Sequence, residues 1–170
     1  MGVAIGVSGE KVAMNPGRTG LIKPAGPVDP EVFVLSVRHA DGRPLAVLAN
    51  YGLHYIGGVP AGAISADYYG VFCDRIQELL QADRQDPPFV GLMSNGTSGN
   101  INNIDFRGGR EKQPPYGQMR LVAQAVADEA VRVCKTIQHR DWASLGAQQT
   151  ELRLGVRLPG KEDLLRANEL

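Results

Sequence analysis

The chain has few of the residues that mark several large protein classes. It contains two cysteines, Cys73 and Cys134, among 170 residues, and they form no CxxC pair. A disulfide framework or a cysteine-rich zinc module is therefore not expected. We predict instead that both cysteines are small apolar core residues inside helices. Cysteine usage leaves the cell compartment open.

An excess of charge of one sign is also missing. Lysine plus arginine and aspartate plus glutamate number 18 each, so the formal net charge is zero. This balance removes the electrostatic reason to expect nucleic acid or an anionic membrane as a main partner, and favours small molecules or other proteins. No transmembrane segment is expected, because no window approaches the ~18 consecutive apolar residues of a membrane helix. The N-terminus lacks the basic and apolar regions of a signal peptide.

What the chain does have is enough apolar content for one ordinary core. Hydrophobic residues make up 43% of the sequence, and a globular chain of this length buries roughly two thirds of its unfolded surface. Residues 1–170 are thus expected to form a single domain or part of one. The helical pattern that begins at residue 160 still continues at Leu170, which indicates that the residues form part of a larger domain.

The spacing of apolar residues predicts an α/β fold. Residues 31–39 and 44–50 alternate on either side of an Asp-Gly turn signal, which predicts a β-hairpin. Residues 67–82 and 119–137 have helical spacing, and residues 89–93 form a compact apolar strand between them. This order favours a mixed or mostly parallel sheet with flanking helices.

Weaker patterns lie outside this central part. Residues 3–5 and 11–14 predict marginal strands, and residues 15–30, with four prolines and three glycines, predict an extended loop. Alternation of leucine and valine with arginine and glycine over residues 152–158 predicts a strand with one solvated face. Residues 160–170 predict a further helix.

Two segments directly follow predicted strands and carry chemically capable side chains. One strand ends in His54, and the next ends in the sequence SNGTSGN, in which Ser98 lies between glycines. One predicted helix connects the two strands, and such a crossover is right-handed. Both strand ends are then expected at one edge of the sheet, where α/β proteins build their sites.

Each of these two side chains is open to more than one interpretation. A histidine at a strand end is typical of zinc ligands, and zinc activates water or polarises a carbonyl, but a single histidine also fits an incidental structural role. Ser98 resembles a nucleophile exposed on a strand-to-loop turn, with backbone N–H groups available to an oxyanion. The same glycines and asparagines also form ordinary turns. His39 and His139, at a predicted turn and a helix end, are expected to be structural.

Several segments, taken in order, resemble one family. These are PVDPEV at residues 27–32, the strand ending in His54, ISAD at residues 64–67, and NGTSGN at residues 95–100. Together they are similar to the central part of the catalytic domain of the neutral/alkaline (non-lysosomal) ceramidases and their bacterial relatives. The resemblance implies a fragment or truncated bacterial homologue of this family.

The resemblance implies a zinc-dependent amidohydrolase that cleaves the N-acyl amide bond of a ceramide-like lipid. It places a zinc ligand at His54 and the catalytic nucleophile at Ser98. Arg18 and Asn100 fall at positions expected to bind the amide substrate. Asp67 is expected to be a helix N-cap, a role also open to Ser65, or a partner that supports the metal ligand.

The chain also departs from the family pattern. Asn-Gly-Thr at residues 95–97 replaces Gly-Asp-Val, Gly99 replaces proline, and Tyr68 and Tyr69 replace Asn-Lys. The family's further zinc ligands, an upstream histidine and a downstream glutamate and tyrosine, have no counterpart here. These 170 residues alone are therefore expected to be inactive or nearly so. The alternative is a non-catalytic α/β binding or structural module that has lost the metal site.

Overall fold

The computed structural model describes residues 7–8, 11–12, 26–104, 113–156 and 158–169. The chain divides into two compact units, Met1–His139 and Arg140–Leu170, and each is described by itself. Whether residues 1–170 act as a single domain stays a prediction.

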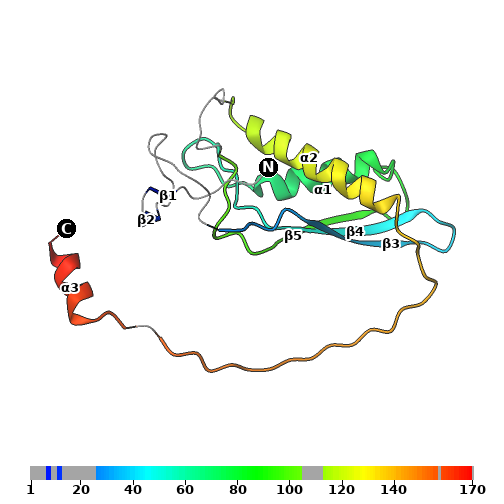
Figure 1. The fold of residues 1–170 in the computed structure, drawn as a ribbon. Helices are drawn as coiled ribbons and strands as arrows, with labels where there is room; N and C mark the ends of the chain where they lie inside the picture. Colours follow the sequence, from blue (N-terminus) through cyan, green and yellow to red (C-terminus); the bar gives the residue numbers. More distant parts are fainter. Residues whose placement is uncertain (1–6, 9–10, 13–25, 105–112, 157, 170) are drawn as a thin grey trace. The chain divides into compact units, whose positions relative to one another are not determined.

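The first unit is built on a three-stranded sheet in the order β3-β4-β5 (Figure 1). β3 (Val32–Arg38) and β4 (Pro44–Tyr51) form the predicted antiparallel hairpin, and β5 (Val90–Asn95) lies parallel to β4. Gly42 in the hairpin turn has a φ of 87°, a conformation that glycine adopts without strain. The sheet is therefore mixed, and the predicted α/β fold class is confirmed.

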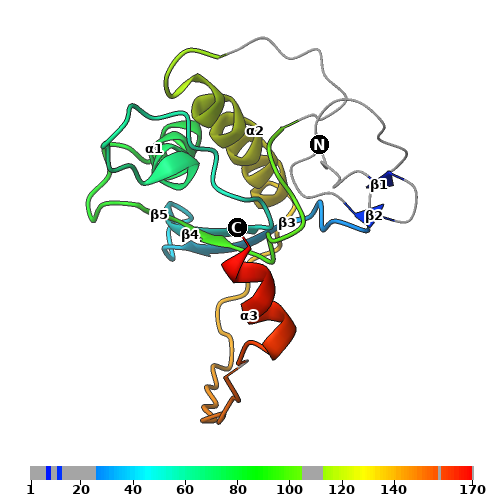
Figure 2. The same ribbon diagram turned by 90° about the vertical axis from the view of Figure 1, so that its left-hand side faces the viewer.

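Both long helices cover the same face of this sheet (Figures 1 and 2). α1 (Asp67–Leu79) packs against β5, and α2 (Gly117–Cys134) packs against α1 and β3. The predicted helices are thus confirmed, with ends shifted by a few residues. The predicted cap of α1 is wrong, because the N-cap residue is Ala66, which makes no side-chain cap bond. The hydroxyl of Ser65 instead accepts a hydrogen bond from the N–H of Asp67 at 3.0 Å.

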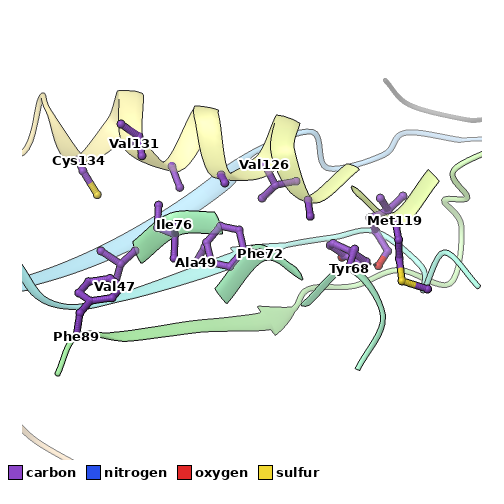
Figure 3. Packing of buried hydrophobic residues seen from close by; sticks show 14 of the residues in the cluster. Val47, Ala49, Tyr68, Phe72, Ile76, Phe89, Met119, Val126, Val131 and Cys134 are labelled. Atoms are coloured by element: carbon purple, nitrogen blue, oxygen red, sulfur yellow. Dashed lines mark hydrogen bonds between the residues drawn. The ribbon is translucent and has the colours of Figure 1, made fainter. Parts of the chain in front are cut away.

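The core lies between the sheet and the two helices (Figure 3). Val47 and Ala49 of β4 point toward the helices, and each fully buried aliphatic or aromatic side chain contributes roughly 1.5–3 kcal/mol. Cys73 is half-buried in α1 and Cys134 is buried in α2, and both are free thiols, as predicted. The largest fully buried side chains of the helices are Tyr68, Phe72, Ile76 and Met119.

The close approach of α1 to β5 depends on Gly91. A Cβ atom at this position would lie 2.9 Å from Cγ2 of Ile76 and 3.0 Å from the carbonyl oxygen of Cys73. Both distances are shorter than van der Waals contacts, and a close-packed interior has no space to absorb the extra atom. Gly91 therefore sets how closely α1 lies on the sheet.

The opposite face of the sheet carries large apolar side chains that remain exposed. Leu35, Leu48 and Leu92 lie side by side across the three strands and are 61%, 37% and 44% exposed. Successive residues of a strand point to opposite faces of the sheet. The neighbours of these three leucines point toward the helices, and the leucines therefore point away from them. Phe33, Val37 and Val90 extend the same surface.

Short strands lie nearer the N-terminus, where β1 (Val7–Ser8) pairs antiparallel with β2 (Lys11–Val12). β2 matches part of the strand predicted over residues 11–14, whereas the one over residues 3–5 lies outside the described residues. The predicted loop over residues 15–30 is described only from residue 26, and there it forms neither helix nor strand.

The second unit contains α3 (Lys161–Asn168), which confirms the helical pattern that begins at residue 160. The strand predicted over residues 152–158 is wrong, since the described residues of this segment form neither helix nor strand. Leu152, Leu154 and Val156 are 75–83% exposed. A strand requires a neighbouring chain to bond its N–H and C=O groups, and alternation does not supply one.

Candidate functional site

The carboxyl ends of β4 and β5 meet at one edge of the sheet. In the parallel register Tyr51 lies opposite Asn95, and the N–H of Gly96 donates to the carbonyl of Tyr51 at 3.0 Å. Residues 52–58, called the His54 loop below, and residues 96–100, the Ser98 loop, therefore begin side by side. The predicted meeting of these two segments at one edge is confirmed.

Glycines allow the two loops to approach more closely than side chains would permit. A Cβ atom at Gly52 would lie 3.0 Å from the carbonyl oxygen of Thr97, and one at Gly96 would lie 3.1 Å from Cα of Gly52. The backbones of the two loops are thus in contact at Gly52, Gly96 and Thr97. The requirement for glycine at these positions is steric.

His54 lies half-buried at the beginning of its loop. Its imidazole packs edge-on against the ring of Tyr55, with centroids 4.5 Å apart and an interplanar angle of 71°. Within the part of the chain that the structure describes, neither ring nitrogen of His54 has a hydrogen-bond partner.

Asp67 holds the backbone of the His54 loop. Its Oδ1 accepts hydrogen bonds from the N–H groups of Ile56 at 2.8 Å and Tyr68 at 2.7 Å, and its Oδ2 accepts one from Gly57 at 2.8 Å. Hydrogen bonds to a carboxylate are stronger than those between neutral groups. Asp67 therefore supports the loop that carries His54, and its contacts are to backbone rather than to the imidazole.

Two tyrosines at the start of α1 contact the residue before His54. The hydroxyls of Tyr68 and Tyr69 donate to the carbonyl oxygen of Leu53 at 3.2 Å and 3.4 Å. Burial raises the pKa of the Tyr68 phenol far above its usual range, so this hydroxyl remains a donor. In the sequence, Tyr68 is one of the apolar residues that predict the connecting helix, and both tyrosines are otherwise only departures from a family pattern. The available signal was a polar aromatic pair at the first turn of the connecting helix.

Ser98 lies half-buried in the second loop, among amide and hydroxyl side chains. Its Oγ accepts a hydrogen bond from Nδ2 of Asn95 at 2.9 Å, which leaves the hydroxyl proton free to be donated. One step back along each strand, Nδ2 of Asn50 donates to Oγ of Ser94 at 2.8 Å. Sequence analysis did not single out these three neighbours, although each stands at or next to a predicted strand end.

The two proposed substrate-binding residues differ in what the structure describes. Asn100 is exposed, and its Nδ2 donates to the carbonyl oxygen of Pro27 at 2.7 Å. This bond ties the Ser98 loop to the segment before β3. Arg18 lies outside the described residues.

The described residues do not by themselves fit a zinc ion. No group of three or more His, Cys, Asp or Glu side chains gathers among them, whereas a tight zinc site needs three or four ligands. Both oxygens of Asp67 face backbone N–H groups. His39 follows β3 at the hairpin turn, and Nε2 of His139 lies 3.1 Å from Oγ of Ser36. His54 is thus a single candidate ligand.

Comparisons with known proteins give no further assignment. No protein-family model, no curated protein and no solved structure matches the chain. In the part of the chain that the structure describes, no helix has the length and apolar character needed to cross a membrane.

Proposed function

We propose that this chain carries the central part of the site of a neutral ceramidase-like hydrolase, which cleaves the N-acyl amide bond of a ceramide-like lipid or a similar small amide. The observation that supports this proposal is the meeting of the His54 loop and the Ser98 loop at one sheet edge. The resemblance requires a histidine and a serine at these two strand ends.

Ser98 is the proposed nucleophile. Because its Oγ accepts the hydrogen bond from Asn95, its own proton can pass to a base while Oγ bonds to the amide carbonyl carbon. The carbon–nitrogen bond then breaks, the amine leaves with a proton, and water releases the acyl group from the serine. The second N–H of the Asn95 amide is a neutral donor of the kind that stabilises an oxyanion.

His54 is proposed to supply one ligand to zinc. When bound, this ion would polarise a carbonyl or activate a water molecule. The described residues hold no group of three metal-ligating side chains, so the ligand set of this proposal is completed from outside them.

The uncharged side chains at the edge suit a neutral amide substrate. Asn50, Ser94 and Asn95 offer hydrogen bonds without a net charge. Asn100 and Arg18 are proposed to contact the substrate, Asn100 through the part of its amide that does not bond Pro27. A small-molecule or lipid amide is the proposed partner.

A second candidate is a non-catalytic α/β module that binds a ligand or another protein. The observation that favours it is that no group of three or more His, Cys, Asp or Glu side chains gathers among the described residues. Such a module would keep the scaffold and lose both zinc and hydrolysis.

Metal analysis after dialysis against a weak chelator tests the proposal. Residues 1–170 alone are expected to be inactive or nearly so, and zinc content is therefore the first readout. Near one zinc per chain in the wild type, lost in His54→Ala and retained in the control His139→Ala, would support the site and would make hydrolysis of a fluorogenic N-acyl amide, compared with Ser98→Ala, the next assay. A wild type that retains no zinc would show that these residues alone do not complete the site, and would favour the non-catalytic module.

A further inference from the structure

We infer that the first turn of α1 is a positioning device for the imidazole of His54, in which Tyr68 and Tyr69 are the positioning residues. The inference rests on the proposed function only in taking His54 as the functional histidine. The tyrosines act through the backbone, since their hydroxyls contact Leu53 and not the imidazole.

The hydrogen bonds enclose the dipeptide His54–Tyr55 from both sides. Before it, the carbonyl of Leu53 accepts the two tyrosine hydroxyls, and after it, the N–H groups of Ile56 and Gly57 donate to Asp67. All these partners come from three consecutive residues, 67–69, of one helix. The backbone on either side of His54 is thus fixed to a single rigid element.

Two donors on one carbonyl exceed what folding alone requires. A buried carbonyl needs one hydrogen-bond partner to offset its loss of water, and Tyr68, which is fully buried, already supplies it. The second donor, from Tyr69, restricts the direction of the carbonyl. The plane of the Leu53–His54 peptide follows that direction, and with it the bond from Cα to Cβ of His54.

The tyrosine pair also has an arrangement that adjacent helical residues do not normally adopt. Successive residues on a helix point about 100° apart and do not face each other. Here the rings of Tyr68 and Tyr69 lie with centroids 4.2 Å apart and planes 33° apart, and both hydroxyls converge on one oxygen. This convergence is the observation that carries the inference.

A substitution of Tyr69 is the best way to test the positioning role separately from folding. It is half-buried, so a phenylalanine keeps the ring and loses a hydroxyl whose bond to Leu53 is the longer of the two, at 3.4 Å. Tyr51→Phe is the matched control, since it removes a phenolic hydroxyl from another half-buried tyrosine two residues before Leu53. The described part of the chain holds no hydrogen bond from the Tyr51 hydroxyl.

The measurement is the proton NMR spectrum of the histidine rings in the metal-free chain. The protein has three histidines, and His54→Ala assigns the signal of interest. We expect Tyr69→Phe to shift or broaden the His54 ring signals, because the imidazole moves relative to the ring of Tyr55. The signals of His39 and His139 and the melting temperature should stay unchanged, as should all three signals in Tyr51→Phe.

Tyr68→Phe and the double variant should enlarge the effect on His54. His54 signals that superimpose on those of the wild type in the double variant would overturn the inference, whatever the zinc content. Equal shifts at all three histidines would also overturn it, because a loss of folding acts on every ring. Shifted His54 signals in a chain that never retains zinc would support the positioning role and count against the proposed zinc hydrolase.

Discussion

The His54 loop and the Ser98 loop follow parallel neighbouring strands, yet they are held in different ways. The first is fixed by a carboxylate and two tyrosine hydroxyls from α1. The second is held by exposed amide side chains, Asn95 on Ser98 and Asn100 on Pro27. Hydrogen bonds to a charged group stabilise by about 1.5–3 kcal/mol, and neutral ones by roughly 0.5–1.5 kcal/mol.

This difference shows what makes a strand-end loop rigid. The two loops are similar in composition and position, because each contains glycine and the two are in contact with each other. The start of α1 supplies buried and half-buried partners to the His54 loop, whereas the side-chain bonds that hold the Ser98 loop are exposed. Under the proposed function, the loop that carries the metal ligand must hold one direction, while the loop that carries the nucleophile must admit a substrate.

The largest expected effect comes from Asp67→Asn. The amide keeps the size of the side chain and tolerates the φ of 53° at this position, but its NH₂ group cannot accept the N–H bonds that one carboxylate oxygen accepts. We expect unfolding free energy to fall by roughly 1–3 kcal/mol, measured by urea denaturation. Asp74→Asn, an exposed change on the same helix, is the control, and an equal effect from both would contradict the proposed role of Asp67.

A smaller effect is expected from Asn95→Ala in the other loop. Removing the amide frees Oγ of Ser98 and costs no more than about 1 kcal/mol, because the bond is exposed. Amide hydrogen exchange should become faster in the Ser98 loop and stay unchanged in the His54 loop. Faster exchange in both loops would show that the two loops are held as one unit, and would contradict the claim that they are held in different ways.

The smallest effect on stability is expected from Asn100→Ala. This substitution removes one exposed bond to Pro27, and surface changes of this kind stay within about 0.5 kcal/mol. If Asn100 contacts the amide substrate as proposed, kcat/KM falls while the urea midpoint does not move. Unchanged kcat/KM would mean that Asn100 does not contact the substrate and only links the loop to the segment before β3.

Much of the fold could be predicted because each main element buries one face. The hairpin, the two long helices and β5 all follow from apolar periodicity, since residues such as Val47 and Phe72 must point into the core. The position of the His54 loop and the Ser98 loop at one edge followed from strand order. The strand predicted over residues 152–158 failed because alternation specifies two faces and does not provide a partner strand.

The supports of the site could not be predicted in the same way. Asp67 can cap a helix or bond a neighbouring loop, and only the path of the loop back to α1 decides between them. The convergence of Tyr68 and Tyr69 on Leu53 depends on the height and angle of α1 above the sheet. These quantities come from the packing of the whole core and are not properties of any local segment.

The arrangement of residues 67–69 on α1 also depends on Gly91, which is remote from them in the sequence. Because α1 rests directly on this glycine, an added methyl group would lift the helix and carry residues 67–69 away from the strand ends. Its neighbours Val90 and Leu92 are exposed on the far face and meet no such barrier. In a mutational library selected only for placement of the histidine, position 91 would retain glycine while positions 90 and 92 varied freely.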